Sequence, residues 1–308
     1  MRLITRSDFD GLACAVLLRH AGIIDSFNFA HPKDIQDGKV EVTENDVLAN
    51  VPYVAGCGLW FDHHISEAQR GSLDKEFKGA CYNAPSAAHI VYDYYGGQEK
   101  FPQFDALLAA VDKADAGQFT LDEIQNPTNW ALLSFIMDPR TGLGRYRDYR
   151  ISNYQLMEAL VEYCQQHAID EILTQPDVQE RVQRYFEQEA EFEIMLHQHT
   201  RVQGSVIITD LRGVAPIATG NRFKIYSLFP EQSVSLWVTD GRNKENVSIA
   251  VGRSIINRTC QTNIGWLMLK YGGGGHAAAG TCQVLPAEAD RVVAEIITAL
   301  EQPDPWIR

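Results

Sequence analysis

Short apolar runs alternate with helical patterns over the first part of the chain. Strands are predicted at residues 2–7, 26–30, 47–49 and 58–61, and helices at residues 11–20, 86–95 and 104–114. Alternating strands and helices are typical of α/β folds. The pattern predicts an N-terminal domain with a mostly parallel sheet and helices on both faces, whose ligands gather at the carboxyl ends of the strands.

The pattern changes in the middle of the chain. Residues 126–150 are rich in Pro, Gly and Arg and predict a loop-linked helical element, and residues 153–199 predict a long helical region with a break at Pro176. Strands are then predicted at residues 205–209, 223–226, 234–238 and 247–251, and a helix at residues 287–300. We therefore expect a first domain with a helical linker at residues 1–195, and a smaller α/β domain with a mixed sheet at residues 200–308.

The composition is that of a globular protein. Hydrophobic residues make up 45% of the 308 residues and charged residues 22%, and no stretch approaches the roughly 18 apolar residues of a membrane helix. The N-terminus shows neither a long apolar segment nor a small-residue cleavage site, and the six cysteines form no C-x-x-C pair. We expect reduced thiols in a cytoplasmic protein that does not enter a membrane.

The charge is acidic but uneven. The net charge is −13, yet residues 201–275 hold nine basic against four acidic residues, which leaves 18 basic and 36 acidic residues elsewhere. A general DNA-coating protein is disfavoured, because phosphate neutralisation needs clustered Lys and Arg. An acidic body with one basic region can hold cations and attract an anionic ligand. The alternative, that the asymmetry has no function, stays open.

Two aspartates follow the first predicted strand. Asp8 and Asp10 are two residues apart, so on an extended segment both carboxylates share one face. Such a pair repels unless a divalent cation relieves the repulsion. An aspartate at this position also commonly caps the helix that follows. Metal ligand and helix cap therefore both remain open for this pair.

A second cluster, Asp62-His63-His64, comes directly after the apolar run at residues 58–61. Imidazole and carboxylate groups together are good ligands for Mn²⁺ or Zn²⁺. A lone histidine is more often an ordinary surface or core residue, but two adjacent histidines behind a strand favour a metal site.

Two further aspartates, Asp112 and Asp115, end a predicted apolar helix. The helix dipole disfavours a carboxylate at a helix C-terminus, which indicates a nearby cation. An exposed acidic helix end is the alternative.

A run of four glycines at residues 272–275 precedes a histidine and three alanines. A tight glycine backbone can bring several N–H groups close to an anion, and a flexible turn is the alternative. Two upstream arginines are candidates for a cationic clamp on phosphate. The predicted substrate-binding residues are Arg253, Arg258, Gly273, Gly274, Gly275 and His276.

In this order and spacing, the motifs resemble those of the DHH phosphoesterase superfamily, and the similarity is strongest to its exopolyphosphatase-related branch. Residues 8–11 resemble its first motif, residues 62–64 the signature motif, Asp112 or Asp115 the fourth, and residues 272–276 the glycine-rich motif of the DHH-associated C-terminal domain. The resemblance implies a metal-binding catalytic domain that uses Mn²⁺, with Mg²⁺ as the alternative, and a second domain that binds the remainder of a phosphorylated substrate in a cleft between them.

Carried over by position, the resemblance assigns roles to single residues. Asp10, His63 and either Asp112 or Asp115 would hold one metal, and Asp8 is left for another. His64 would face the substrate phosphate, and Asp62 is assigned to catalysis with it.

Two positions depart from the family pattern. Ile4 stands where a histidine is usual, and Asn50 stands where an aspartate is usual. We therefore expect one tightly bound metal per chain, with a poor second site. His31, after the second predicted strand, is a replacement ligand or a surface histidine, and the surface interpretation is favoured.

The sequence therefore predicts a metal-dependent hydrolase of a phosphoester or phosphoanhydride, with a nucleotide, short oligonucleotide or polyphosphate as substrate. The alternative is a protein of the same fold that binds a nucleotide without hydrolysing it, which the residues at positions 4 and 50 favour. A nucleic-acid exonuclease is disfavoured by the acidic charge. A homodimer is compatible with the sequence.

Overall fold

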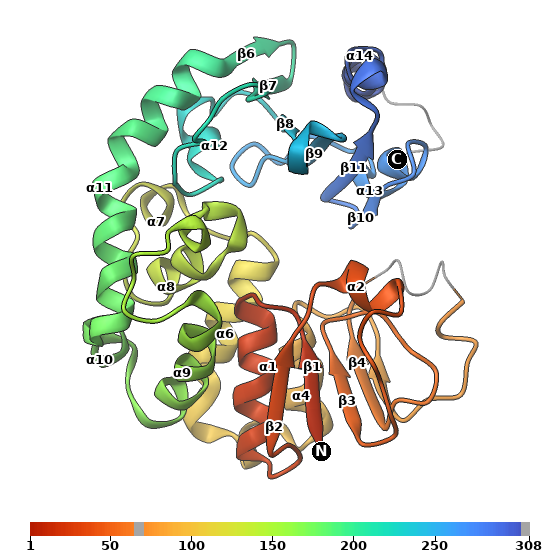
Figure 1. Cartoon of the computed structure of the whole chain (residues 1–308), viewed down its shortest axis with the longest axis vertical. Helices are drawn as coiled ribbons and strands as arrows, with labels where there is room; N and C mark the ends of the chain where they lie inside the picture. Colours follow the sequence, from red (N-terminus) through yellow and green to blue (C-terminus); the bar gives the residue numbers. More distant parts are fainter. Residues whose placement is uncertain (65–70, 303–308) are drawn as a thin grey trace. The chain divides into compact units, whose positions relative to one another are not determined.

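A computed structural model describes residues 1–64 and 71–302 (Figure 1). It divides into two compact units: Met1–Phe119 with Asn126–Glu187, and Thr120–Gln125 with Gln188–Arg308. The division falls inside the long helix α11 (Pro176–His199). The predicted domain limits, which concern independent folding, remain a prediction, and residues 303–308 of the predicted second domain lie outside the described residues.

The first unit is built on a five-stranded parallel sheet in the order β2-β1-β3-β4-β5 (Figure 1). Its strands are β1 (Arg2–Thr5), β2 (Ser26–Phe29), β3 (Asp46–Ala49), β4 (Leu59–Asp62) and β5 (Gly79–Cys81). The predicted parallel α/β sheet is confirmed. Among these strands β5 alone has no counterpart in the predicted set, because Gly-Ala-Cys shows no apolar run.

Both faces of this sheet are covered. Ile4, Leu48 and Trp60 lie side by side on one face and pack with Ile35 of the short helix α2 (Pro32–Gln36). On the opposite face Phe61 contacts Tyr94 of α4 at a ring-centroid distance of 5.1 Å. Alternation along each strand sends successive side chains to opposite faces, so a wholly apolar strand needs cover on both.

Helices make up the rest of the first unit. They are α1 (Phe9–His20), α4 (Ala87–Tyr94), α5 (Gly97–Lys100), α6 (Asp105–Asp115), α8 (Asn129–Met137), α9 (Asn153–Gln166) and α10 (Ile169–Thr174). The predicted long helical region is thus three helices, α9, α10 and α11, and α11 begins at the predicted break at Pro176. None of the described helices combines the length and the apolar character that crossing a membrane requires.

The second unit contains a six-stranded mixed sheet in the order β10-β11-β9-β8-β7-β6. Its strands are β6 (Thr200–Gln203), β7 (Val206–Asp210), β8 (Val234–Asp240), β9 (Val247–Arg253), β10 (Gly274–Gly275) and β11 (Ala279–Val284). The helices α13 (Ile264–Leu269) and α14 (Ala289–Glu301) bury one face of the sheet in a single apolar cluster. The short α7 (Leu121–Gln125) also belongs to this unit. The predicted mixed sheet is confirmed.

One predicted strand is wrong. Residues 223–226 alternate like a strand, but Lys224–Leu228 form helix α12. From this helix the Tyr226 hydroxyl group reaches the sheet, where it lies 2.8 Å from Ser235 Oγ and donates a hydrogen bond to Gly252 O at 3.1 Å. Tertiary packing therefore overrides the local strand preference, as happens in short segments.

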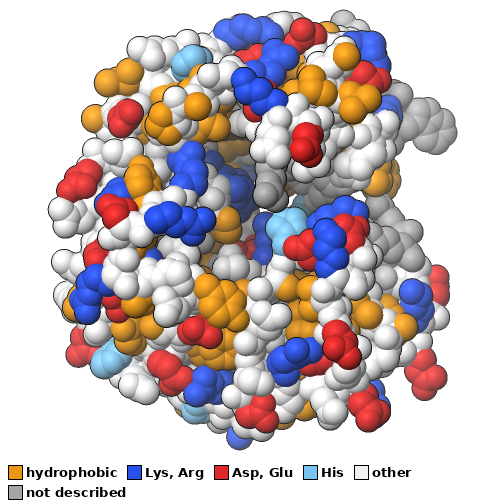
Figure 2. Space-filling model, in the orientation of Figure 1, with side chains coloured by type: hydrophobic (Ala, Val, Ile, Leu, Met, Phe, Trp, Pro, Cys, Tyr) orange, Lys and Arg blue, Asp and Glu red, His pale blue; other side chains and the backbone are white. Residues whose placement is uncertain are grey.

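The basic residues of the second unit are partly balanced by ion pairs. Arg212 contacts Asp210 at 2.6 Å and Asp290 at 2.7 Å, and Lys224 contacts Glu189 at 2.8 Å. On the face seen in Figure 2, acidic and basic side chains are interspersed. Part of the predicted excess of basic residues is therefore neutralised by acidic residues of the same unit.

Gly11 lets α1 start directly behind β1. A Cβ atom at this position would lie 1.9 Å from Arg6 O and 2.8 Å from Thr5 Oγ1. We expect Gly11→Ala to lower the free energy of unfolding by about 1–3 kcal/mol, because the added methyl group pushes the backbone at position 11 away from the carbonyl group of Arg6. Urea denaturation followed by circular dichroism measures the change.

Gly274→Ala is the matched control for this change. Its Cβ would meet only Leu269 Cδ2 at 4.0 Å, so its stability should stay within about 0.5 kcal/mol of the parent chain. Equal stability of both variants would show that the close approach at Gly11 is not required.

Candidate functional site

The site lies at the carboxyl edge of the parallel sheet. Asp8 and Asp10 follow β1, Asn50 follows β3, and His63 follows β4. Strands that run the same way end at the same edge, so residues distant in sequence meet there. The edge gathers most of the polar residues that the sequence singled out in the first unit.

Asp10 is a buried carboxylate held by a helix N-terminus. It is 2% exposed, and it accepts hydrogen bonds from Ala87 N at 3.0 Å and Ala88 N at 2.8 Å, in the first turn of α4. Burial and the charges of Asp115 and Asp8 raise the pKa of Asp10 well above its usual value, although the two N–H groups oppose the shift. A divalent cation would offset the cost of keeping this carboxylate ionised.

His63 presents a ring nitrogen to two carboxylates. Its Nδ1 lies 3.2 Å from Ala84 O, which can only accept, so Nδ1 carries the proton. Its Nε2 lies 3.7 Å from Asp10 Oδ2 and 3.4 Å from Asp115 Oδ2. The three ligand atoms lie within 4.8 Å of one another. One imidazole and two carboxylates are a donor set that suits a divalent transition metal or Mg²⁺ with water.

The two candidate aspartates of α6 have different surroundings. Asp112 Oδ1 accepts a hydrogen bond from Ser86 Oγ at 2.6 Å, and Asp112 Oδ2 lies 2.7 Å from His89 Nδ1. Ser86 in turn caps α4, whose N–H groups hold Asp10. Asp115, one turn further, is the residue that faces His63. The geometry therefore favours Asp115 as the ligand and gives Asp112 a positioning role.

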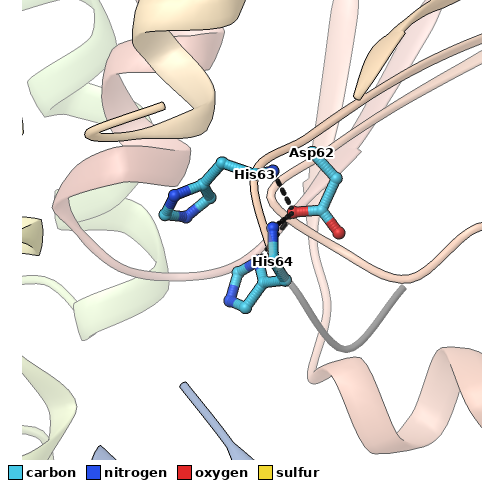
Figure 3. A group of neighbouring side chains, drawn as sticks. All are labelled: Asp62, His63 and His64. Carbon is cyan, nitrogen blue, oxygen red and sulfur yellow. Dashed lines mark hydrogen bonds and ion pairs between the residues drawn. The ribbon is translucent and has the colours of Figure 1, made fainter. Parts of the chain in front are cut away.

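Asp62 organises the turn that carries the two histidines (Figure 3). Its Oδ1 accepts hydrogen bonds from His63 N at 2.9 Å, His64 N at 3.4 Å and His64 Nδ1 at 2.6 Å. These three residues also place ligand atoms within 4.8 Å of one another, but this Asp62 oxygen already accepts from its own motif. Asp62 Oδ1 therefore positions both histidines, and the predicted catalytic role of Asp62 remains a prediction.

His64 is the cation of this turn. Burial lowers its pKa, but the charge and hydrogen bond of Asp62 outweigh burial and raise the pKa of His64 to about 9. His64 is therefore an imidazolium at neutral pH, a form that can donate to an anion. Its predicted contact with the substrate phosphate remains a prediction.

Asp8 serves as the helix cap that the sequence left open. Its Oδ1 accepts a hydrogen bond from Gly11 N at 3.0 Å at the start of α1 and another from Asn50 Nδ2 at 3.0 Å. Its Oδ2 lies 3.0 Å from Arg6 Nε. Ile4, by contrast, is fully buried in the apolar layer of the sheet. Both carboxylate oxygens of Asp8 thus have partners from the chain itself.

His31 lies away from the ligand group. It caps α2, where its Nδ1 accepts from Lys33 N at 3.1 Å, and it is exposed. Within the described part of the chain it belongs to no group of metal-ligating side chains. The surface interpretation of His31 therefore stands.

Sequence reasoning missed two arginines near the site. Arg6 contacts Asp8, and Arg140 donates to Asp138 at 2.7 Å. Desolvation lowers the pKa of Arg140, but the charges of Asp138, Asp8 and Asp115 raise it by more. Arg6 could have been found, because it lies two residues before Asp8 in the sequence, whereas only the fold brings Arg140 near.

In the second unit the arginine candidates bind backbone. Arg253 donates from Nε to Thr262 O at 3.0 Å and from Nη2 to Gln261 O at 3.0 Å. Arg258 donates from Nε to Ile255 O at 3.1 Å. Arg253 therefore ties the end of β9 to the following loop, and its predicted role as a phosphate clamp stays a prediction.

The second half of the glycine run is a strand rather than an open loop. Gly274 and Gly275 form β10, which pairs with Thr281 and Gly280 of β11. At Gly273 a Cβ atom would lie 2.2 Å from Thr281 O. Close packing against β11 explains Gly273 and Gly275, and the predicted contact of the glycine N–H groups with an anion remains a prediction. His276 follows that edge, and its N–H donates to Ala279 O at 2.7 Å.

No protein-family model matches the chain, and neither does any curated protein. Among solved structures, the pGpG-specific phosphodiesterase PggH from Vibrio cholerae is 48% identical, with a TM-score of 0.79 over 98% of this chain and 99% of that one. A DHH domain from a member of a family of ribosomal proteins is 14% identical, with a TM-score of 0.59 over 97% and 86%. RecJ from Thermus thermophilus, solved with Mn²⁺, is 14% identical, with a TM-score of 0.57 over 99% and 52%.

The fold and the site define a phosphoester hydrolase with a group of side chains that could hold a metal ion. The chain belongs to the DHH phosphoesterase family, as its motifs predict. The departures at Ile4 and Asn50 pointed to a protein that binds without hydrolysing, but a relative 48% identical over nearly its whole length is a phosphodiesterase. The alternative without hydrolysis is therefore not favoured.

The geometry predicts which aspartate of α6 holds the metal. Asp115→Asn and His63→Ala should each weaken Mn²⁺ binding more than 10-fold, because each removes a ligand atom of the group around Asp10. Asp112→Asn should weaken Mn²⁺ binding about 10-fold or less, because Asp112 acts on the ligand group only through Ser86. Isothermal titration calorimetry on chelator-treated protein measures all three, and circular dichroism confirms folding. Loss of the metal in Asp112→Asn with retention in Asp115→Asn would reverse the assignment.

Proposed function

We propose that this chain is a phosphodiesterase that hydrolyses pGpG, a short linear dinucleotide. The observation that supports this most is the 48% identity to a pGpG-specific phosphodiesterase over 98% of the chain. The chemistry of the site agrees, since a buried imidazole and carboxylate group at a sheet edge suits a metal that works on phosphate.

The reaction adds water to the phosphorus atom and breaks its bond to the 3′ oxygen, which leaves two molecules of GMP. A bound divalent cation makes the attacking water more acidic and neutralises charge on the phosphate oxygens. Asp10, His63 and Asp115 would hold that cation. His64, an imidazolium through its contact with Asp62, would donate to a phosphate oxygen on which charge develops.

The second unit would bind the substrate away from the scissile bond. We assign this role to the β10 edge and His276, because an edge strand exposes backbone donors and acceptors on one side. Arg253 would contribute less than the sequence suggested, since its guanidinium group already donates to two carbonyl oxygens.

Three further assignments belong to this proposal. Mn²⁺ is the expected ion, with Mg²⁺ as the alternative, because the ligand set mixes imidazole with carboxylates. The six cysteines are all free thiols, which supports a cytoplasmic location. A homodimer stays a prediction.

A substrate panel tests the activity. With Mn²⁺ present, pGpG should be hydrolysed to GMP with a kcat/KM at least about 10-fold above that for pApA, since hydrogen bonds to a base discriminate strongly. Polyphosphate and the cyclic dinucleotide, which has no terminal phosphate, should react far more slowly. Chromatography of the products measures this, with His63→Ala as the inactive control. Faster release of phosphate from polyphosphate than of GMP from pGpG would refute the proposal.

His276→Ala tests the role of the second unit. We expect a KM for pGpG about 10-fold higher with unchanged metal content, because the ligand atoms of the metal group belong to the first unit. His197→Ala is the matched control, since this exposed histidine lies on α11 in the same unit. Metal loss from folded His276→Ala would contradict the division of roles.

A further inference from the structure

Asp8 is a carboxylate that the protein itself neutralises. Its Oδ1 accepts from Gly11 N and Asn50 Nδ2, each at 3.0 Å, and its Oδ2 lies 3.0 Å from Arg6 Nε. Two N–H donors and one guanidinium group provide what a carboxylate next to a metal would otherwise obtain from the metal. Among the described residues Asp8 belongs to no group of ligand atoms that could hold an ion.

The neighbours of Asp8 are suited to this arrangement and unsuited to a second metal. Asn50 is 2% exposed and sits at a φ of 56°, a left-handed conformation that asparagine tolerates. Because the Asp8 carboxylate can only accept, the Asn50 group facing it is the NH₂. An aspartate at position 50 would instead bring two carboxylates together, which needs a cation between them. Ile4 is buried among apolar side chains and offers no ligand atom.

Arg6 has hydrogen-bonding capacity beyond its contact with Asp8. Its side chain is 38% exposed, and within the described part of the chain only the contact from Nε to Asp8 is formed. A guanidinium group has five N–H donors in a plane and matches the oxygen geometry of a phosphate.

We propose that Arg6 takes the place of a second metal ion: its guanidinium group neutralises Asp8 and binds a non-bridging oxygen of the scissile phosphate. A phosphodiester carries one negative charge over two such oxygens, so one divalent cation and one arginine suffice to hold it. The phosphate contact rests on the proposed phosphodiesterase function, whereas the single metal does not.

The metal count tests the first half of the proposal. Chelator-treated full-length protein, loaded with Mn²⁺ and desalted, should retain one equivalent, and its low-temperature electron paramagnetic resonance spectrum should show an isolated ion. Two retained equivalents with an exchange-coupled spectrum would overturn the proposal, whatever the substrate is.

A double variant tests whether Arg6 excludes the second ion. Arg6→Ala with Asn50→Asp removes the guanidinium group and makes the amide a second carboxylate beside Asp8. The retained Mn²⁺ should rise from one equivalent to two. The matched control is Arg19→Ala, whose side chain is also 38% exposed and pairs with Glu162 at 2.7 Å at the other end of α1. A folded double variant that still holds one ion would overturn the replacement.

Kinetics test the phosphate contact. Arg6→Gln should lower kcat/KM for pGpG about 10²-fold with one metal still bound, and Arg6→Lys should recover part of the loss, because it restores the charge without the planar donors. Arg19→Gln should change kcat/KM less than about 2-fold, since exposed ion pairs far from the reacting atoms contribute little. Equal activity of Arg6→Gln and the parent chain would overturn the contact.

Bis(p-nitrophenyl) phosphate, a phosphodiester without a nucleotide, separates the two proposals. If the parent chain hydrolyses it but not pGpG, the proposed substrate is wrong. The Arg6 variants then still test the phosphate contact, because Arg6→Gln must slow this probe by a similar factor. An unchanged rate on the probe would overturn the Arg6 proposal alone.

Discussion

The site depends on one buried carboxylate. Asp10 is nearly inaccessible, and its main hydrogen bonds come from Ala87 and Ala88 at the start of α4. These bonds connect α1 to α4, and Asp10 also faces His63 of the β4 edge. A carboxylate in such surroundings is costly to ionise, so the N–H dipoles at the start of α4 stabilise its charge and a bound cation would stabilise it further.

Neighbouring aspartates of the same edge have different tasks because their partners differ. Asp8 is satisfied by Arg6 and by N–H donors, and Asp112 is satisfied by Ser86 and His89. Asp115 has a histidine ring nitrogen as its neighbour and more contact with solvent. Hydrogen bonds do not by themselves exclude a ligand role, since both oxygens of Asp10 accept one. Asp10 and Asp115 differ from the other two because each has an oxygen beside His63 Nε2, so position and not residue type decides which aspartates are candidate ligands.

Packing explains much of what looked like ligand chemistry in the second unit. The glycines at residues 273–275 allow β10 to lie against β11, since added Cβ atoms would meet backbone at Gly273 and Gly275. Arg253 stabilises a loop through carbonyl oxygens. His276, at the end of the edge strand, stays the proposed recognition residue.

The sequence by itself determined the parallel sheet and the polar edge. Apolar runs of strand length followed by Asp10 and His63 suffice, because parallel strands end together and must place such residues side by side. The choice between Asp112 and Asp115 could not be made this way. The two are one helical turn apart on α6, and only the packing of α6 decides which of them reaches the His63 ring. The cap at Asp8 and its pairing with Arg6 were likewise decided by tertiary structure, since local sequence permits both a helix cap and a metal ligand. The donors around this carboxylate come from the residues that follow β1 and β3 and from α1.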